Sequence, residues 1–440
     1  MLKRLRIPLV LLAVGGTLGT RASVRAQTPA EVARGREAYA EAVAAYRAGD
    51  HPVFLAAIER ADALRPAHPG ILYALASARS LSGDPAGAVE TLVRLADMGL
   101  AYDPTADEDF AALAGDPGFA DAAARLAANG RPAGVADSAF TLPWPDFVPE
   151  GIARDPESGV FFVSGVHGRR VVRIDADGRA EPFVEGLWSA LGLAVDPARR
   201  ILWIGTAAIP ETADVDSTEI GRGAVIGVDL DTRRRVAELL LPDNGSEHVP
   251  GDLSVTADGT LFVSDAAAGT LWVLRPGAEA LDVLVGPDAL VSPQGSALSA
   301  DGRTLWLADY SLGILAVDPA TGAARRLRQP ADAALLGIDA LLLHGDDLIA
   351  VQNGVRPARV LRLRVDPHAT ELRSWEILAA GLPAFEEPTG ATVVGGRLYL
   401  IANSHWDRFE DGRLPDPTSL SPPLVLSIAL DTPSAVMLEN

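Results

Sequence analysis

Two carboxylates and one amide stand at equivalent positions of a segment that recurs six times in the second part of the chain. The first positions of the six copies are Glu150, Leu191, Gly251, Gln294, Asp339 and Thr389. If each copy opens an inner strand around one channel, these side chains encircle the channel mouth. Carboxylate and amide oxygens suit a hard cation such as Ca²⁺, which takes six to eight oxygen ligands, some from water. The ring therefore predicts a divalent metal site, with Ca²⁺ as the expected ion. In the alternative reading, Glu150 and Asp339 only accept hydrogen bonds from backbone amides at the rim.

Further polar residues are expected on the same rim, because the chain returns there after the second strand of each repeat. They include His167, Asn353 and His405, and His248 is placed there too. The two longest insertions, Ala207–Gly223 and Asn403–Pro423, also follow second strands. Binding residues tend to lie on such loops.

Several kinds of chemistry are excluded by composition. The chain has no cysteine, and its only lysine, Lys3, lies in residues 1–26, which are expected to be removed as a signal peptide. No Gly-x-Ser-x-Gly elbow, His-Glu-x-x-His helix or Gly-x-Gly-x-x-Gly turn is present. Thiol chemistry, Schiff-base chemistry and the common serine hydrolase and zinc motifs are therefore ruled out.

The elements that must position the ring are short strands. Each repeat reads as strand, tight turn and strand, with hairpin signals such as Asp258-Gly259 and Asp301-Gly302. Successive copies begin 41, 60, 43, 45 and 50 residues apart, which is the size of a propeller blade. The pattern predicts a mostly β fold, with a six-bladed β-propeller over residues 136–432. A strand within Ser138–Leu142 is expected to complete the last blade and close the ring.

Residues 27–130 have a helical pattern instead. Units Arg36–Pro69 and Gly70–Pro104 are followed by a third, degenerate unit at Asp107–Gly130. Small and large residues of the second unit, such as Ala76, Gly83 and Leu92, resemble a tetratricopeptide repeat. Such a segment either binds a protein partner on its concave face or serves as a spacer docked on the next domain.

The two ends of the chain are assigned separately. Residues 1–26 carry a basic start, a short apolar run and a Val24-Arg25-Ala26 site, which predicts a signal peptide and a secreted or periplasmic protein. The apolar run is shorter than the roughly 20 residues of a membrane span, so no span is expected after cleavage. Residues 433–440 are assigned as a C-terminal tail.

The charge of the chain bears on its partners. The net charge is −20, and removing residues 1–26 leaves 33 basic against 58 acidic residues, or about −25. An acidic surface repels phosphate backbones, so nucleic acid is not an expected partner.

The propeller repeats resemble the gluconolactonase, regucalcin and luciferin-regenerating-enzyme family over about residues 140–432. The similarity rests on Pro149-Glu150-Gly151, the segment Pro293–Asp309 and Gly337-Ile338-Asp339. The resemblance implies that Glu150, Gln294 and Asp339 hold a divalent cation, although the family has Asn where this chain has Gln294. A second family Asn, in a Pro-Asn-Asp segment that helps to bind substrate, corresponds to Gly251.

Two functions follow from these patterns. The first is an exported metal-dependent lactonase-like hydrolase acting on a lactone or sugar-derived ester, with Asp339 as the catalytic residue that helps to activate water, as the resemblance implies. The predicted substrate-binding residues are Asp252, His405, Asn403, Asn353 and His167. The second is a non-catalytic envelope protein that binds a partner through the propeller rim or the helical repeat.

Overall fold

The computed structural model describes residues 25, 27–366, 368, 370–414, 416 and 419–431. The predicted signal peptide, apart from Arg25, and the predicted tail 433–440 lie outside the described residues. Within them, no helix is both long and apolar enough to cross a membrane.

The N-terminal part is helical, as expected. Its α-helices are α1 (Pro29–Arg47), α2 (His51–Leu64), α3 (Pro69–Leu81), α4 (Pro85–Asp97) and α5 (Pro117–Asn129), and 3₁₀ turns lie at η1 (Pro104–Ala106) and η2 (Glu108–Leu113). Each α-helix starts with proline in its first turn, after a capping side chain that accepts a backbone N–H. The helical segment is thus confirmed, and its tetratricopeptide identity stays a prediction.

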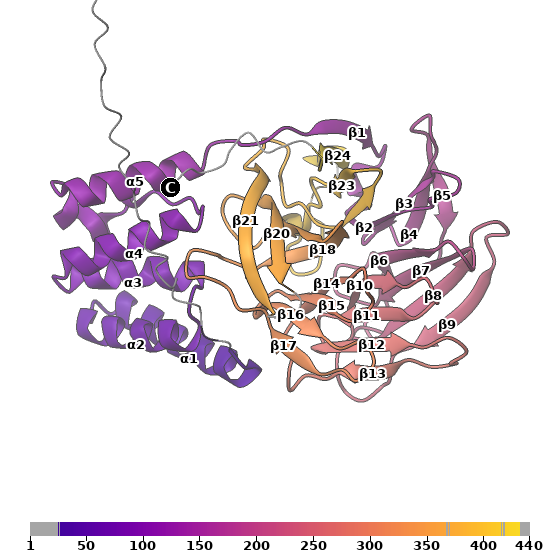
Figure 1. The fold of residues 1–440 in the computed structure, drawn as a ribbon, viewed down its shortest axis with the longest axis horizontal. Coiled ribbons are helices and arrows are strands. Elements are labelled where there is room, and N and C mark those ends of the chain that lie inside the picture. The colour runs from indigo at the N-terminus through magenta and orange to yellow at the C-terminus, as the bar shows by residue number, and fades with distance from the viewer. Residues whose placement is uncertain are drawn as a thin grey trace, which may run out of the picture.

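The remaining strands form six four-stranded sheets around one channel, which confirms the six-bladed propeller (Figure 1). Blade one contains β2 (Pro149–Arg154), β3 (Phe161–Gly165), β4 (Arg170–Ile174) and β5 (Ala180–Val184). Blade two contains β6 (Ser189–Asp196), β7 (Ile201–Ala207), β8 (Gly223–Asp229) and β9 (Arg235–Leu240). Blade three contains β10 (Pro250–Val255), β11 (Leu261–Asp265), β12 (Thr270–Leu274) and β13 (Asp282–Val285).

Blade four contains β14 (Pro293–Leu298), β15 (Leu305–Asp309), β16 (Gly313–Val317) and β17 (Ala324–Arg326). Blade five contains β18 (Ile338–His344), β19 (Asp347–Gln352), β20 (Arg359–Asp366) and β21 (Glu371–Ala380). Blade six contains β22 (Ala391–Val394), β23 (Arg397–Ile401), β24 (Leu424–Ala429) and β1 (Asp137–Thr141). Strand β1 pairs antiparallel with β24, so the first strand of the chain closes the ring as predicted.

A glycine follows the first position in several repeats because inner strands approach one another there. A Cβ at Gly151 would lie 2.4 Å from the carbonyl oxygen of Leu191, and one at Gly295 would lie 2.3 Å from the backbone nitrogen of Leu341. Contacts of under 3 Å to backbone leave room only for hydrogen. The recurring glycine is therefore required by the close packing of one blade on the next.

The helical segment lies against blades four and five (Figure 1). Arg359 of β20 is fully buried and donates to the carbonyl oxygen of Met98, at the end of α4, at 2.8 Å. Val355 and Ala334 of blade five pack into the hydrophobic core of the helices. The helical segment and the propeller thus share a buried apolar and polar contact.

Candidate functional site

The inner strands begin with irregular pairing, and this irregularity positions the first residues of the repeats. Pairing between the first and second strands shifts just after Pro149, Pro250, Pro293 and Ile338. A bulge bends the strand and re-aims the side chain that it carries. Glu150, Gly251, Gln294 and Asp339 occupy these positions.

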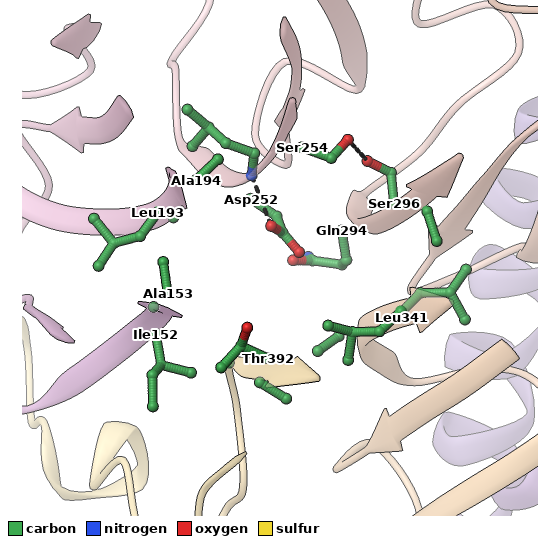
Figure 2. A pocket seen from close by; sticks show the side chains of 18 of the residues that line it. Ile152, Ala153, Leu193, Ala194, Asp252, Ser254, Gln294, Ser296, Leu341 and Thr392 are labelled. Atoms are coloured by element: carbon green, nitrogen blue, oxygen red, sulfur yellow. Dashed lines mark hydrogen bonds between the residues drawn. The ribbon is translucent and has the colours of Figure 1, made fainter. Parts of the chain in front are cut away.

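A central cavity of about 340 Å³ runs along the inner strands and is lined by Glu150, Asp252, Gln294 and Asp339. Figure 2 shows the Asp252 and Gln294 side chains pointing toward one another on its wall. The other two first positions, Leu191 and Thr389, are buried and do not line it. The three predicted metal ligands therefore line one cavity. Of the six first positions of the repeats, four line it and two do not.

Each of the two predicted carboxylate ligands is held by a hydrogen bond from a loop that follows a second strand. Trp406 donates its indole Nε1 to Oε2 of Glu150 at 2.6 Å, and Asn353 donates Nδ2 to Oδ2 of Asp339 at 3.0 Å. Tyr310 in turn donates its hydroxyl to Oδ1 of Asn353 at 3.0 Å. These donors orient the carboxylates, and all of them are neutral.

A further carboxylate, Glu387, acts on the same site and was not predicted. Its negative charge raises the pKa of both Glu150 and Asp339. Glu387 has a left-handed backbone, with φ of 74°, and accepts hydrogen bonds from Ser404 and the backbone N–H of Asp407. It lies before β22, outside the repeat pattern, so no sequence periodicity marks it.

The electrostatics of the site are those of crowded, partly buried acids. Burial raises the pKa of Asp252 to about 7, with a further contribution from Asp339. Burial and then the charge of Glu387 raise the pKa of Asp339 to about 7. Burial, followed by repulsion from Asp339, raises the pKa of Glu150 well above its ordinary range. Neutral donors alone therefore do not offset the cost of ionising these carboxyl groups.

Two strained residues adjoin the site. Val148, just before β2, has φ of 50°, and His405, just before the 3₁₀ turn η4 (Trp406–Arg408), has φ of 65°. A β-branched residue in this region is uncommon and costs of order 1–3 kcal/mol. The strain falls on the two segments that carry Glu150 and Trp406, which form a hydrogen bond with each other.

The predicted substrate-binding residues divide into two groups. Asp252 lines the cavity and Asn353 contacts Asp339, as described above. Asn403 and His405 are buried within the loop 402–423, where Asn403 accepts from the backbone N–H of Leu424 at 2.7 Å and His405 Nε2 contacts the carbonyl oxygen of Ser421 at 3.0 Å. Their polar atoms close this loop, and neither residue lines the cavity.

The two remaining rim histidines also lie away from the cavity. His167 contacts the carbonyl oxygen of Glu211 through Nδ1 at 3.4 Å and packs edge-on against Phe409. His248 is buried, with Nδ1 2.6 Å from Asp265 and Nε2 2.9 Å from the carbonyl oxygen of Pro242. Both imidazoles thus connect loops of the rim.

The fit of a metal ion can be judged from the donor set. No three His, Asp or Glu side chains in the described ranges are grouped so that they could hold one ion. The predicted set contains only two carboxylates, Glu150 and Asp339, plus the amide of Gln294, so this finding does not test it. Carboxylate and amide oxygens are the donors that Ca²⁺ prefers, and the partly buried acids lack a cationic partner among the interactions described above. The chemistry of the residues fits a hard divalent cation.

The Gln294 side chain also reaches the space beside Gly251. A Cβ added to Gly251 would lie 3.9 Å from Oε1 of Gln294, and few other atoms come near it. The longer amide at position 294 thus approaches the place where a side chain at position 251 would stand.

Comparison with known proteins finds solved structures at low sequence identity. No model of a protein family matches the chain, and no curated protein matches it. A gluconolactonase from Xanthomonas campestris shares 19% identity over 68% of this chain and 98% of its own, with a TM-score of 0.45. The calcium-binding protein regucalcin from Agrobacterium tumefaciens shares 17% over 66% and 94%, with a TM-score of 0.46. A virginiamycin B lyase from Staphylococcus aureus shares 12% over 66% and 83%, also with a TM-score of 0.46.

The structural neighbours thus include the gluconolactonase and regucalcin propellers that the repeats resemble. At these identities and scores the likeness carries no argument about activity, so function is argued from the site alone.

Proposed function

We propose that the protein is an exported, metal-dependent hydrolase of lactones or related carboxylic esters, with its site at the channel mouth. The observation that supports this most is the set of partly buried carboxylates that line the cavity, Glu150, Asp252 and Asp339, whose pKa values are raised by burial and by neighbouring carboxylates, Glu387 among them. Such a set gains most from a bound cation, since the attraction offsets both burial and repulsion.

Each residue at the channel mouth has a proposed role in binding the cation or in hydrolysis. Glu150, Gln294 and Asp339 would hold the cation, which when bound supplies Lewis-acid polarisation of an ester carbonyl. Asp339 would also accept a proton from the attacking water, and the charge of a bound cation would keep its carboxylate ionised. Asn353 keeps the Asp339 carboxylate oriented through its 3.0 Å hydrogen bond, and Trp406 does the same for Glu150 at 2.6 Å.

The test combines metal titration with a lactone panel. Ca²⁺, Mn²⁺ or Zn²⁺ should raise the melting temperature of the wild type. At a metal concentration one hundred times the dissociation constant, the free energy of unfolding should rise by about 2.7 kcal/mol. Asp339→Ala should abolish this response and the hydrolysis, whereas Gln294→Asn should preserve or strengthen both. Asp301→Ala, in the exposed hairpin turn between β14 and β15, is the matched control and should change neither.

A non-catalytic envelope protein that binds a partner through the propeller rim or the helical repeat is the second candidate. Gly251 favours it, because the resemblance implies a substrate-binding amide at that position. A wild type that is indifferent to metal ions and chelator and inert towards every lactone would favour this candidate. If the carboxylates only accept rim hydrogen bonds, Asp339→Ala would lower stability with no metal dependence at all.

A further inference from the structure

Three arginines lie where the helical segment contacts blade four, and none of them lines the central cavity. Arg36 lies on α1, Arg65 caps the C-terminus of α2, and Arg326 ends β17. Figure 1 shows α1 lying beside β17. Arg36 Nη2 donates to Oγ of Ser311 at 3.0 Å, which fixes α1 against the loop between β15 and β16.

The backbone makes room for two of these side chains. A Cβ at Gly35 would fall 2.5 Å from Cγ of Arg65, so the stem of Arg65 crosses α1 where α1 has no side chain. A Cβ at Gly313, two residues after Ser311, would lie 3.5 Å from Nη2 of Arg326. The stem of Arg65 is thus packed closely against α1, and Arg326 lies at ordinary contact distance from Gly313.

One nitrogen atom of each of two side chains, Arg65 and the partly buried Arg326, is buried without a hydrogen-bond acceptor among the described residues. Arg65 is only 8% exposed, and its Nε is buried without an acceptor. Nη1 of Arg326 is likewise buried without an acceptor. A buried ionised group without hydrogen bonds is costly, and native structures rarely leave one unmatched. The unmatched donors therefore indicate a missing acceptor of opposite charge.

The charges around the junction lead to the same conclusion. Burial and the positive charge of Arg36 lower the pKa of Arg65 to about 10. Burial also lowers the pKa of Arg326 to about 10, with repulsion from Arg65 opposing the attraction of Asp309. The oxygens of Asp309 already accept backbone N–H groups from Val291, Ser292, Ser311 and Leu312. The nearby acid is thus engaged elsewhere, and the arginines repel one another.

We propose that this junction is an oxyanion-binding site in which Arg65 and Arg326, with Arg36 at its edge, hold a phosphate- or sulfate-type group between the helices and blade four. Guanidinium groups pair with such oxygens through paired, charge-assisted hydrogen bonds. A tetrahedral oxyanion presents oxygens in several directions, which suits donors that come from separate elements. A bound oxyanion would tie α1 and the end of α2 to the propeller. The inference is independent of the function proposed for the channel.

The test is a thermal melt of the full chain in phosphate, sulfate, acetate or chloride at matched ionic strength. Phosphate or sulfate should give a saturable rise in the melting temperature of roughly 2–4 °C. These anions also stabilise proteins generally by exclusion from the surface, but that effect is not saturable. Arg65→Gln and Arg326→Gln should lose the saturable part. Arg303→Gln, whose side chain is 82% exposed, is the control that should keep it.

Arg36→Gln provides a second variant that is safe for folding, because Arg36 is exposed. It should raise the half-saturating phosphate concentration several-fold. Equilibrium dialysis of the wild type with inorganic phosphate should find one bound ion per chain at millimolar concentration or below. A rise that is linear and equal in all variants, together with no binding in dialysis, would overturn the proposal. A saturable response to acetate alone would overturn the assignment to a tetrahedral oxyanion.

Discussion

At the scale of single residues, the channel mouth holds carboxyl groups that no cationic side chain neutralises among the interactions described above. Asp252 and Asp339 have pKa values raised to about 7, chiefly by burial. Because these values exceed the ordinary 3.8, the folded state holds protons that the unfolded chain has released. The stabilising effect is complete below the unfolded pKa and is lost as the pH rises through the folded one.

The metal-free protein should therefore become less stable as the pH rises from about 4 to about 7. Melting temperatures measured across this window in the presence of chelator would show the decline. Asp339→Asn should flatten the curve, and Asp301→Asn, on an exposed turn, should leave it unchanged. Calcium should offset the loss most at the upper end, because a cation binds the ionised carboxylates. A metal-free stability that increases steadily over the window would contradict the raised pKa values.

The hydrogen bond from Trp406 to Glu150 gives a second prediction. The indole N–H lowers the pKa of Glu150 against the effects of burial and of Asp339. Trp406→Phe should therefore weaken the binding of calcium by about 1.5–3 kcal/mol, which is the range for a hydrogen bond to a charged group. Calorimetric titration with Ca²⁺ would measure the change.

Trp188→Phe is the matched control for this measurement. Trp188 donates to Oε2 of Glu219 at 3.1 Å in the same manner, but neither residue lines the cavity. Equal effects of the two substitutions on calcium affinity would show that the Trp406 contact has no special role.

At the scale of elements, the ring depends on one strand that comes from the other end of the propeller sequence. β1 supplies the outermost strand of blade six and pairs with β24 through Asp137–Thr141. Arg397 donates to Asp137, which adds an ion pair across this blade.

Deleting residues 131–145 should expose the edge of β24 and leave the ring unclosed. Unpaired strand edges promote association between chains, so the variant should aggregate on heating. Light scattering during a thermal ramp would detect this. A deletion variant that remains monomeric with an unchanged melting temperature would show that β1 is dispensable for closure.

At the scale of the whole molecule, the helices and the propeller meet through Arg359. Its side chain is fully buried, and Nε donates to Oε1 of Gln352 at 2.6 Å while Nη1 donates to the carbonyl oxygen of Met98 at 2.8 Å. The carbonyl groups at the end of α4 carry the negative end of the helix dipole, which suits a guanidinium group.

Arg359→Ala should lower the free energy of unfolding by about 3 kcal/mol or more, because it leaves buried acceptors of the helices and of the propeller unpaired. Calorimetry should then resolve two unfolding transitions, whereas the wild type is expected to unfold in one. Arg364→Ala, on the same strand with a side chain 54% exposed, should leave a single transition. One cooperative transition in both variants would show that the apolar contacts alone couple the two parts.

The amino-acid sequence by itself determined the architecture. The six repeats, their spacing and their hairpin turns are local features, and each blade has to pack on a neighbour to bury its apolar residues. The same register placed Glu150, Gln294 and Asp339 at strand starts, so their meeting at one cavity follows from the repeat.

Only the tertiary structure decided which other side chains belong to the site. Glu387 acts on it and Trp406 bonds to Glu150, whereas Asn403 and His405 are buried within their own loop. All four lie outside the repeat, where the path of a long loop, and not a periodic pattern, sets the direction of each side chain. The arginine junction is of the same kind. Arg65 and Arg326 are 261 positions apart by their residue numbers, and they meet only because the helices dock on blade four.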